Sequence, residues 1–274
     1  MLKERQAQMA GTWYPGDPDQ LQEQISSMLE QSRISYDAGP PRALAVPHAG
    51  YMYSGQVAAC GFKTLGEEQY DTIVVIAPSH REAFPGVSLF EGDAYHTPLG
   101  RLGVDKELLR TIAAHDNGTT LRLSTKGHRE EHSLELQLPF LQLLQHDFKL
   151  VPLVMGEQDY ETAEELAKIL HQVCADRKCL VVASTDLSHF HSLKKAKELD
   201  GRFIELFSAN KPRELAGELS TGCVEACGGG PVLAAMLFNQ LGGGTSYQVV
   251  KYDTSARVTR DEENVVGYFA GVMT

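Results

Sequence analysis

The sequence contains no apolar run long enough to cross a membrane. About 18 uninterrupted apolar residues would be needed, and none occur in the 274 residues. The opening stretch, MLKERQAQMAGTWYP, also lacks the apolar core of a signal peptide. These absences argue against an integral membrane protein and against a secreted one. We therefore expect a cytoplasmic protein with no membrane partner.

Positive charge is also scarce. The chain has 25 Lys and Arg against 36 Asp and Glu, a formal net charge of −11, and no stretch gathers basic residues into a patch. Proteins bind the phosphate backbone of nucleic acids through clustered Lys and Arg. We therefore expect no nucleic-acid partner.

Closely spaced cysteine pairs are missing as well. The five cysteines are an odd number and none stands in a CxxC spacing. A disulfide framework is therefore not expected, and in a reducing compartment each cysteine is by default a small buried apolar residue.

What the sequence does contain is an alternation of strand-like and helix-like segments. Short, nearly continuous apolar runs, typical of strands covered on both faces, occur at 42–46 (RALAV), 71–78 (DTIVVIAP), 148–154 (FKLVPLV) and 179–184 (CLVVAS). Residues 55–65 (GQVAACGFKTL) have the length and period of a crossover helix, which predicts a βαβ unit.

Apolar periodicity and capping residues predict the remaining elements. Helices are expected at 19–31, 106–115, 131–145, 160–174, 192–208 and 231–241, with a short one after Asn210, and strands at 86–90, 247–253 and 264–272. Residues 1–274 are therefore expected to form a single α/β domain, with a mixed, mostly parallel sheet and helices on both faces.

Histidines follow three of the predicted strands. His48 follows RALAV, His80 follows DTIVVIAP, and Asp186 and His189 follow CLVVAS. In open α/β sheets, ligands bind where the carboxyl ends of the strands meet. We therefore expect these side chains to gather at one edge of the sheet.

Cys227 adds a ligand of a different kind. It lies just before a glycine-rich turn and a helix started by Pro231, where the positive end of the helix dipole favours a thiolate. Imidazole with thiolate suits iron, copper or zinc rather than magnesium or calcium, which predicts a mononuclear metal site. Glu225 is a rival third ligand, because a carboxylate commonly completes a two-histidine site. His132 either folds over the sheet edge or lies on the surface at a helix N-terminus.

A series of short motifs occurs in order along the chain. They are AGTWYPGDPDQL, PHAGYMYSG, APSHR, TPLG, EHSLELQLPFLQ, VPLVMG, STDLSHF, CGGGP and NVVGYFAG. In these motifs the chain resembles the Memo (mediator of cell motility) family, whose microbial members are named AmmeMemoRadiSam system protein B. The resemblance covers essentially the entire chain.

The resemblance implies a fold related to the class III extradiol dioxygenases, with an open metal site at one edge of the sheet. The metal-facing residues that the resemblance implies are His48, His80 and Cys227. The surrounding acid/base and orienting groups that the resemblance implies are His189, Asp186 and His132. A carboxylate such as Asp186 would orient an imidazole. Extradiol dioxygenases complete the site with a glutamate, whereas Cys227 stands at this position, which changes the charge and softness of the site.

Three functions follow as expectations. The first is an oxidoreductase that uses iron (Fe²⁺), or else copper, on an unknown small substrate, with His189 as general base; a zinc hydrolase is the remaining chemical alternative. The second is an adaptor that binds a peptide or metabolite in the same pocket without chemistry. The third, implied by the microbial family name, is a modification pathway shared with radical-SAM and AMMECR-type proteins. Exposed strand edges suggest a homodimer.

Overall fold

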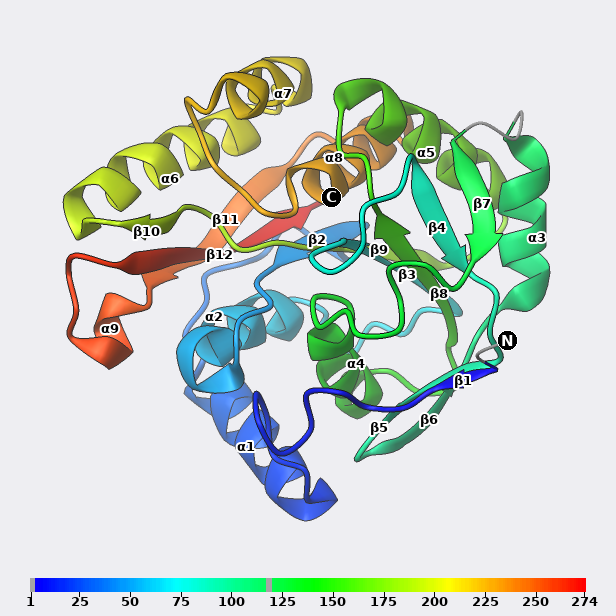
Figure 1. The fold of residues 1–274 in the computed structure, drawn as a ribbon, viewed down its shortest axis with the longest axis horizontal. Coiled ribbons are helices and arrows are strands. Elements are labelled where there is room, and N and C mark those ends of the chain that lie inside the picture. The colour runs from blue at the N-terminus through cyan, green and yellow to red at the C-terminus, as the bar shows by residue number, and fades with distance from the viewer. Residues whose placement is uncertain (1–2, 117–119) are drawn as a thin grey trace.

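The centre of the molecule is a set of parallel strands (Figure 1). The computed structural model describes residues 3–116 and 120–274. Neighbouring strands run in the order β2 (Ala43–Val46), β9 (Cys179–Ser184), β3 (Thr72–Pro78) and β8 (Lys149–Met155). They are buried along almost their whole length. Burial on both faces explains why the sequence predicted each of them as a nearly continuous apolar run.

Antiparallel pairing begins on either side of this centre. On one side β12 (Val265–Met273) runs antiparallel to β2, and it also pairs with β11 (Tyr247–Thr254) and β10 (His189–His191). On the other side β4 (Val87–Phe90) runs antiparallel to β8, and β7 (Leu121–Ser124) is parallel to β4. The predicted mixed sheet is therefore confirmed, with four parallel strands at the centre and an antiparallel step on either side of them.

A small second sheet lies beside the N-terminal segment and was not predicted. It consists of β1 (Glu4–Arg5), β5 (Ala94–Thr97) and β6 (Gly100–Gly103). These strands are two to four residues long, too short to show an alternating pattern in the sequence. This sheet positions Arg5. The guanidinium of Arg5 donates hydrogen bonds to the carbonyls of His128 and Glu131, and so holds the segment that follows residue 127.

Helices cover both faces of the main sheet, as predicted (Figure 1). One face carries α1 (Pro18–Gln31), α2 (Tyr51–Lys63), η1 (Glu135–Gln137) and α4 (Leu138–Leu144). The other carries α5 (Tyr160–Val173), α6 (Leu193–Ser208), α7 (Pro212–Thr221) and α8 (Gly229–Leu241). The remaining helices are α3 (Lys106–His115), beside β7, and α9 (Ala256–Thr259). Within the described ranges no helix combines the length and apolar character that a membrane span requires.

The helix starts show which sequence signals were reliable. Asp17, Asp105 and Asp159 each accept a hydrogen bond from a backbone N–H in the first turn of α1, α3 and α5. Such caps satisfy N–H groups that have no partner inside the helix. At two helices that no side chain caps, the predicted start differs from the structure: α2 begins at Tyr51 rather than residue 55, and α8 begins at Gly229 rather than residue 231.

The predicted helix at 131–145 is shorter than expected. Residues 131–134 form no helix, and the helical stretch begins with η1 at Glu135. The apolar pattern of the segment is helical, but Glu131 is drawn away by hydrogen bonds to other parts of the chain. This departure from local pattern is what shapes the site described below.

Phe190 in β10 has an unfavourable backbone conformation. Its φ is 60°, in the left-handed region that bulky residues avoid, and its side chain is 72% exposed. A β-carbon costs about 1–2 kcal/mol in this region. We therefore expect Phe190→Gly to be more stable than Phe190→Ala by about 1 kcal/mol in urea denaturation.

The control is Leu123, another large apolar residue of an edge strand that is partly exposed, at 37%. Its φ is not positive, so Leu123→Gly should be less stable than Leu123→Ala, the usual order in a strand. The same order at both positions would show that Phe190 is not strained.

Candidate functional site

The predicted meeting of strand ends is found in the structure. Strands β2, β9 and β3 are adjacent and parallel, so the segments after them emerge at the same edge. The ring centroids of His48 and His80 lie 5.2 Å apart, and that of His132 lies 5.4 Å from His48 and 4.6 Å from His80. His132 therefore folds over the sheet edge, which was one of its two predicted positions.

Cys227 completes a group that could hold a metal ion. Its Sγ lies 3.1 Å from Nε2 of His48, and one ligand atom from each of His48, His80 and Cys227 lies within 4.8 Å of the others. With metal–donor bonds of about 2.0–2.3 Å, donor atoms around a tetrahedral ion lie about 3.5 Å apart. The three side chains therefore need only small shifts to bind one ion.

Each imidazole is held through its other ring nitrogen. Nδ1 of His48 lies 2.8 Å from Oγ of Ser184, and Nδ1 of His80 lies 2.9 Å from Oε1 of Glu131. Nε2 of each ring is therefore available to a metal ion. A metal-binding histidine usually has such an outer partner, which fixes the tautomer and the orientation of the ring. The donor set and its supports fit a soft or borderline transition metal.

Glu131 is the site residue that sequence reasoning missed. It is buried, its Oε2 accepts the backbone N–H of His80 at 2.6 Å, and its Oε1 accepts Oγ–H of Ser133 at 2.9 Å. Burial alone would raise its pKa, but the hydrogen bonds and charge of His80 lower that pKa to about 2. One sequence signal could have identified Glu131 as a site residue. It is a carboxylate directly before His132, in the run EEHS.

Asp186 is close to the site but plays a different part from the one predicted. Its Oδ1 accepts the backbone N–H of His48 at 2.8 Å. It therefore fixes the main chain of His48, whereas the carboxylate that orients an imidazole is Glu131. Burial raises the pKa of Asp186 to about 7, although the hydrogen bond from His48 opposes this rise.

His132 is packed among rings with little freedom. Trp13 lies against it at 4.5 Å between centroids. Its Nδ1 is 3.2 Å from Oε1 of Glu131, but the angle is not that of a hydrogen bond, and this buried nitrogen has no hydrogen-bond partner in the described chain. Burial lowers the pKa of His132 to about 4, so the ring is neutral at pH 7. His80, Glu131 and His132 form a second, overlapping group of possible ligands.

The thiol of Cys227 differs from the expectation based on the helix dipole. Its Sγ accepts the backbone N–H of Asp186 at 3.2 Å. Burial, reinforced by the charge of Asp186, raises the pKa of the thiol above its usual range. The α8 dipole, which acts from beyond Gly228, would favour the thiolate instead. A bound metal would remove the proton, because a coordinating thiol is deprotonated outright.

Glu225 and His189 lie next to this group rather than in it. Both carboxylate oxygens of Glu225 are 2.9 Å from Nε2 of His191. Among the described residues, Cys227 rather than Glu225 stands with the two histidines. His189 is on β10, and burial lowers its pKa, partly offset by a hydrogen bond to the backbone of Leu187. It lines a pocket together with Cys227.

Removing the charge of Glu131 should weaken metal binding. In Glu131→Gln the amide is a poorer partner for Nδ1 of His80, which accounts for a loss of about 10–100-fold in affinity. The measurement is competition with a metal chelator. Gln142→Glu exchanges an amide for a carboxylate of the same shape, at a position whose hydrogen bonds go to Thr97 and Gly100 rather than to the three ligands. This variant should leave metal affinity unchanged. An affinity of Glu131→Gln equal to wild type would show that the contact between Glu131 and Nδ1 of His80 does not support metal binding.

Comparison with known proteins identifies the family. A model of the Memo family, described as Memo-like protein, matches residues 5–272. Relatives called MEMO1 family protein occur in Methanobrevibacter smithii (32% identity, 98% of this chain and 99% of the relative) and Methanosarcina mazei (34%, 98% of each). A third occurs in Thermotoga neapolitana (33%, 98% of this chain and 99% of the relative).

A solved structure shares the fold. It is that of an uncharacterized protein from Escherichia coli K12, with a TM-score of 0.54 and 15% sequence identity, covering 84% of this chain and 98% of that one. At this identity the likeness concerns the fold alone. The match of the family model over nearly the whole length, together with relatives above 30% identity, shows that this chain belongs to the Memo family.

Proposed function

We propose that this protein is a metal-dependent oxidoreductase whose Fe²⁺ is held by Nε2 of His48, Nε2 of His80 and Sγ of Cys227. One observation carries the proposal: the three side chains converge while both Nδ1 atoms are already occupied. Two imidazoles with one carboxylate, leaving open positions, are the ligand set of non-haem iron oxygenases. The thiolate of Cys227 would here supply the anionic ligand in place of the carboxylate. The protein is proposed to act in the cytoplasm, where the thiol stays reduced.

Bound iron would supply one-electron redox chemistry with dioxygen. The residues of the chain would then do the rest. His189 lies on the wall of the neighbouring pocket, where its imidazole can take a proton from a substrate hydroxyl. Asp186 keeps the main chain of His48 in place through its 2.8 Å hydrogen bond. Trp13 and His132 pack against each other and exclude water from one side of the group.

The test has two stages. First, the metal content of protein purified anaerobically without added metal is measured, and we expect iron at about one equivalent. Second, oxygen consumption by the iron-loaded protein is followed with a panel of catechols and small metabolites. We expect consumption with at least one compound, and its loss in His48→Ala.

Other outcomes distinguish the alternatives. Zinc as the native metal, with hydrolysis and no oxygen consumption, would replace the proposal with a hydrolase. Consumption that persists in His48→Ala would show that the reaction takes place elsewhere. As a control, His115→Ala removes an exposed imidazole at the end of α3, and it should behave as wild type.

A further inference from the structure

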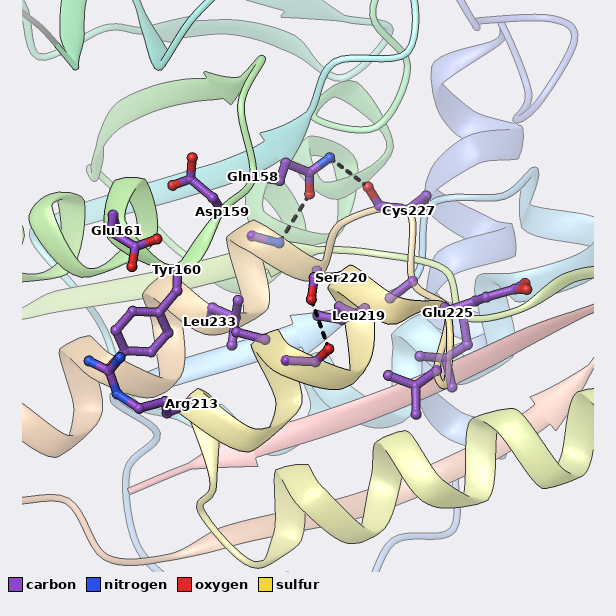
Figure 2. Close-up of a pocket in the computed structure, with 18 of the residues that line it drawn as sticks. Gln158, Asp159, Tyr160, Glu161, Arg213, Leu219, Ser220, Glu225, Cys227 and Leu233 are labelled. Carbon is purple, nitrogen blue, oxygen red and sulfur yellow. Dashed lines mark hydrogen bonds between the residues drawn. The ribbon is translucent and has the colours of Figure 1, made fainter.

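A large pocket adjoins the metal group on the side of α5, α7 and α8 (Figure 2). Its volume is about 740 Å³, within the range of sites for small organic molecules. Cys227 lies at one end, and Tyr160 and Arg213 lie at the other; His189 also lines the pocket. Among the described residues, neither His48 nor His80 lines it. The pocket therefore meets the metal group only through the segment that carries Cys227.

The body of the pocket is apolar. Leu187 comes from the segment after β9, Leu219 and Ala216 from α7, Val224 from the following loop, and Leu233 from α8. Leu187 and Val224 are almost fully buried. Ala216 and Leu219 are only partly buried, so a ligand with an apolar body would remove their exposed surface from water, a favourable contribution to binding.

The wall next to Cys227 is held rigidly. The side chain of Gln158 donates from Nε2 to the carbonyl of Cys227 at 2.9 Å and accepts at Oε1 from the amide of Gly230 at 3.0 Å. Both bonds are drawn in Figure 2. The side chain thus ties the start of α8 to the start of α5, so the pocket is formed before a ligand arrives. A preformed pocket avoids part of the ordering cost of binding.

The charged side chains that line the pocket are mainly acidic. Asp159 and Glu161, both exposed, belong to the N-terminal turn of α5, and Glu225 lies opposite, beside Cys227. Arg213 is the cation that lines the same pocket. Its guanidinium carbon lies 4.1 Å from the ring centroid of Tyr160, and a nitrogen lies 3.8 Å from Glu164.

The charge balance therefore selects against anions. The lining carries three carboxylates, those of Asp159, Glu161 and Glu225, against the guanidinium of Arg213. Glu225 is bonded to His191, and Arg213 contacts Glu164, which Lys168 also binds, whereas Glu161 has no ion pair within the described chain. The protein as a whole carries a formal charge of −11, which adds to the negative potential at the mouth. A cationic group would be attracted to this mouth and a carboxylate repelled.

We propose that this pocket binds a small organic amine, with its apolar body against α7 and α8 and its ammonium group beside Asp159 and Glu161 at the start of α5. Cys227 lines this pocket, whereas His48 and His80 do not, and binding of the amine requires neither a bound metal nor the oxidoreductase activity. Binding is measured directly, so failure of one proposal leaves the other standing.

The experiment compares three probes of the same shape by calorimetry on the full chain. They are 4-phenylbutylamine, 4-phenylbutanol and 4-phenylbutyrate, which carry a positive, a neutral and a negative end. We expect the amine to bind about tenfold more tightly than the carboxylate, with the alcohol between them, and the difference to shrink at high salt. Equal or tighter binding of the carboxylate, or binding of none of the three, overturns the proposal.

Two matched pairs of variants locate the binding. Gly217, in α7, lines the pocket, and a β-carbon there would meet nothing within 4 Å. Gly201, in α6, has equally open surroundings but does not line the pocket. Gly217→Trp should abolish binding of the amine while Gly201→Trp leaves it unchanged. Binding that survives Gly217→Trp in a folded protein places the probe elsewhere and overturns the assignment.

The second pair tests the charge. Glu161 and Glu107 occupy the same place in the first turn of an Asp-capped helix, α5 and α3. Glu161→Gln should weaken binding of the amine severalfold and leave the alcohol unaffected, whereas Glu107→Gln should change neither. An equal loss for the amine and the alcohol would show that Glu161 acts through packing and would contradict the charge argument.

Discussion

Replacing Cys227 with alanine should reduce metal affinity by more than the roughly 10–100-fold that loss of an outer partner costs. The variant keeps His48 and His80 but loses the sulfur that lies 3.1 Å from Nε2 of His48. An imidazole ligand carries no negative charge, so the variant loses the anionic thiolate that would offset the charge of the ion. The measurement is metal content after dialysis against a weak chelator, together with competition titration.

The control lies four residues away. Cys223 is exposed and free, and it belongs to neither of the two possible ligand groups. Cys223→Ala should bind metal as wild type does, which excludes a general effect of losing a thiol. Cys227→Ala removes little apolar surface, so its thermal stability without metal should fall by only about 1 kcal/mol. Full metal binding by a folded Cys227→Ala would reject the proposed ligand set.

Replacing Glu135 with glutamine should be the most destabilising of the changes considered. Glu135 is completely buried and pairs with Arg5, which is 1% exposed. It also accepts the hydroxyl of Tyr14 at 2.5 Å and the backbone N–H of Met9 at 2.9 Å. Loss of its charge leaves the Arg5 guanidinium buried without a counter-ion, which costs about 3–5 kcal/mol. Urea denaturation measures this directly.

The comparison is an ion pair at the surface. Glu164 and Lys168 are 2.7 Å apart on α5 but largely solvated. Glu164→Gln should cost less than about 1 kcal/mol, because water screens exposed pairs. A cost for Glu135→Gln as small as that of Glu164→Gln would mean that Arg5 finds other compensation.

Glu135→Gln should also disturb the metal group. Besides Glu135, Arg5 holds the carbonyls of His128 at 2.8 Å and Glu131 at 2.6 Å. These bonds keep the non-helical segment in the position from which Glu131 reaches His80. A loosened Arg5 should therefore lower metal affinity as well as stability. Stability and the candidate site are linked through this buried arginine.

The sequence alone determined the elements whose signals are local. The central strands β2, β3, β8 and β9 are covered on both faces, so each is a continuous apolar run. Aspartate caps fixed the starts of α3 and α5. The placement of His48 and His80 directly after strands then predicted that they would meet, because parallel strands end at a common edge. Short strands such as β1 and β5 carry too few residues for any pattern.

Only the tertiary structure decided what each site residue does. Residues 131–134 are part of a helical pattern, yet Glu131 leaves it because His80 and Ser133 offer it hydrogen bonds from other directions. Cys227 precedes a helix, yet burial in the folded chain raises the pKa of its thiol. Hydrogen-bond partners and burial depend on residues far apart along the chain. A local pattern records which groups are present at a site, and only the folded chain determines which of them touch.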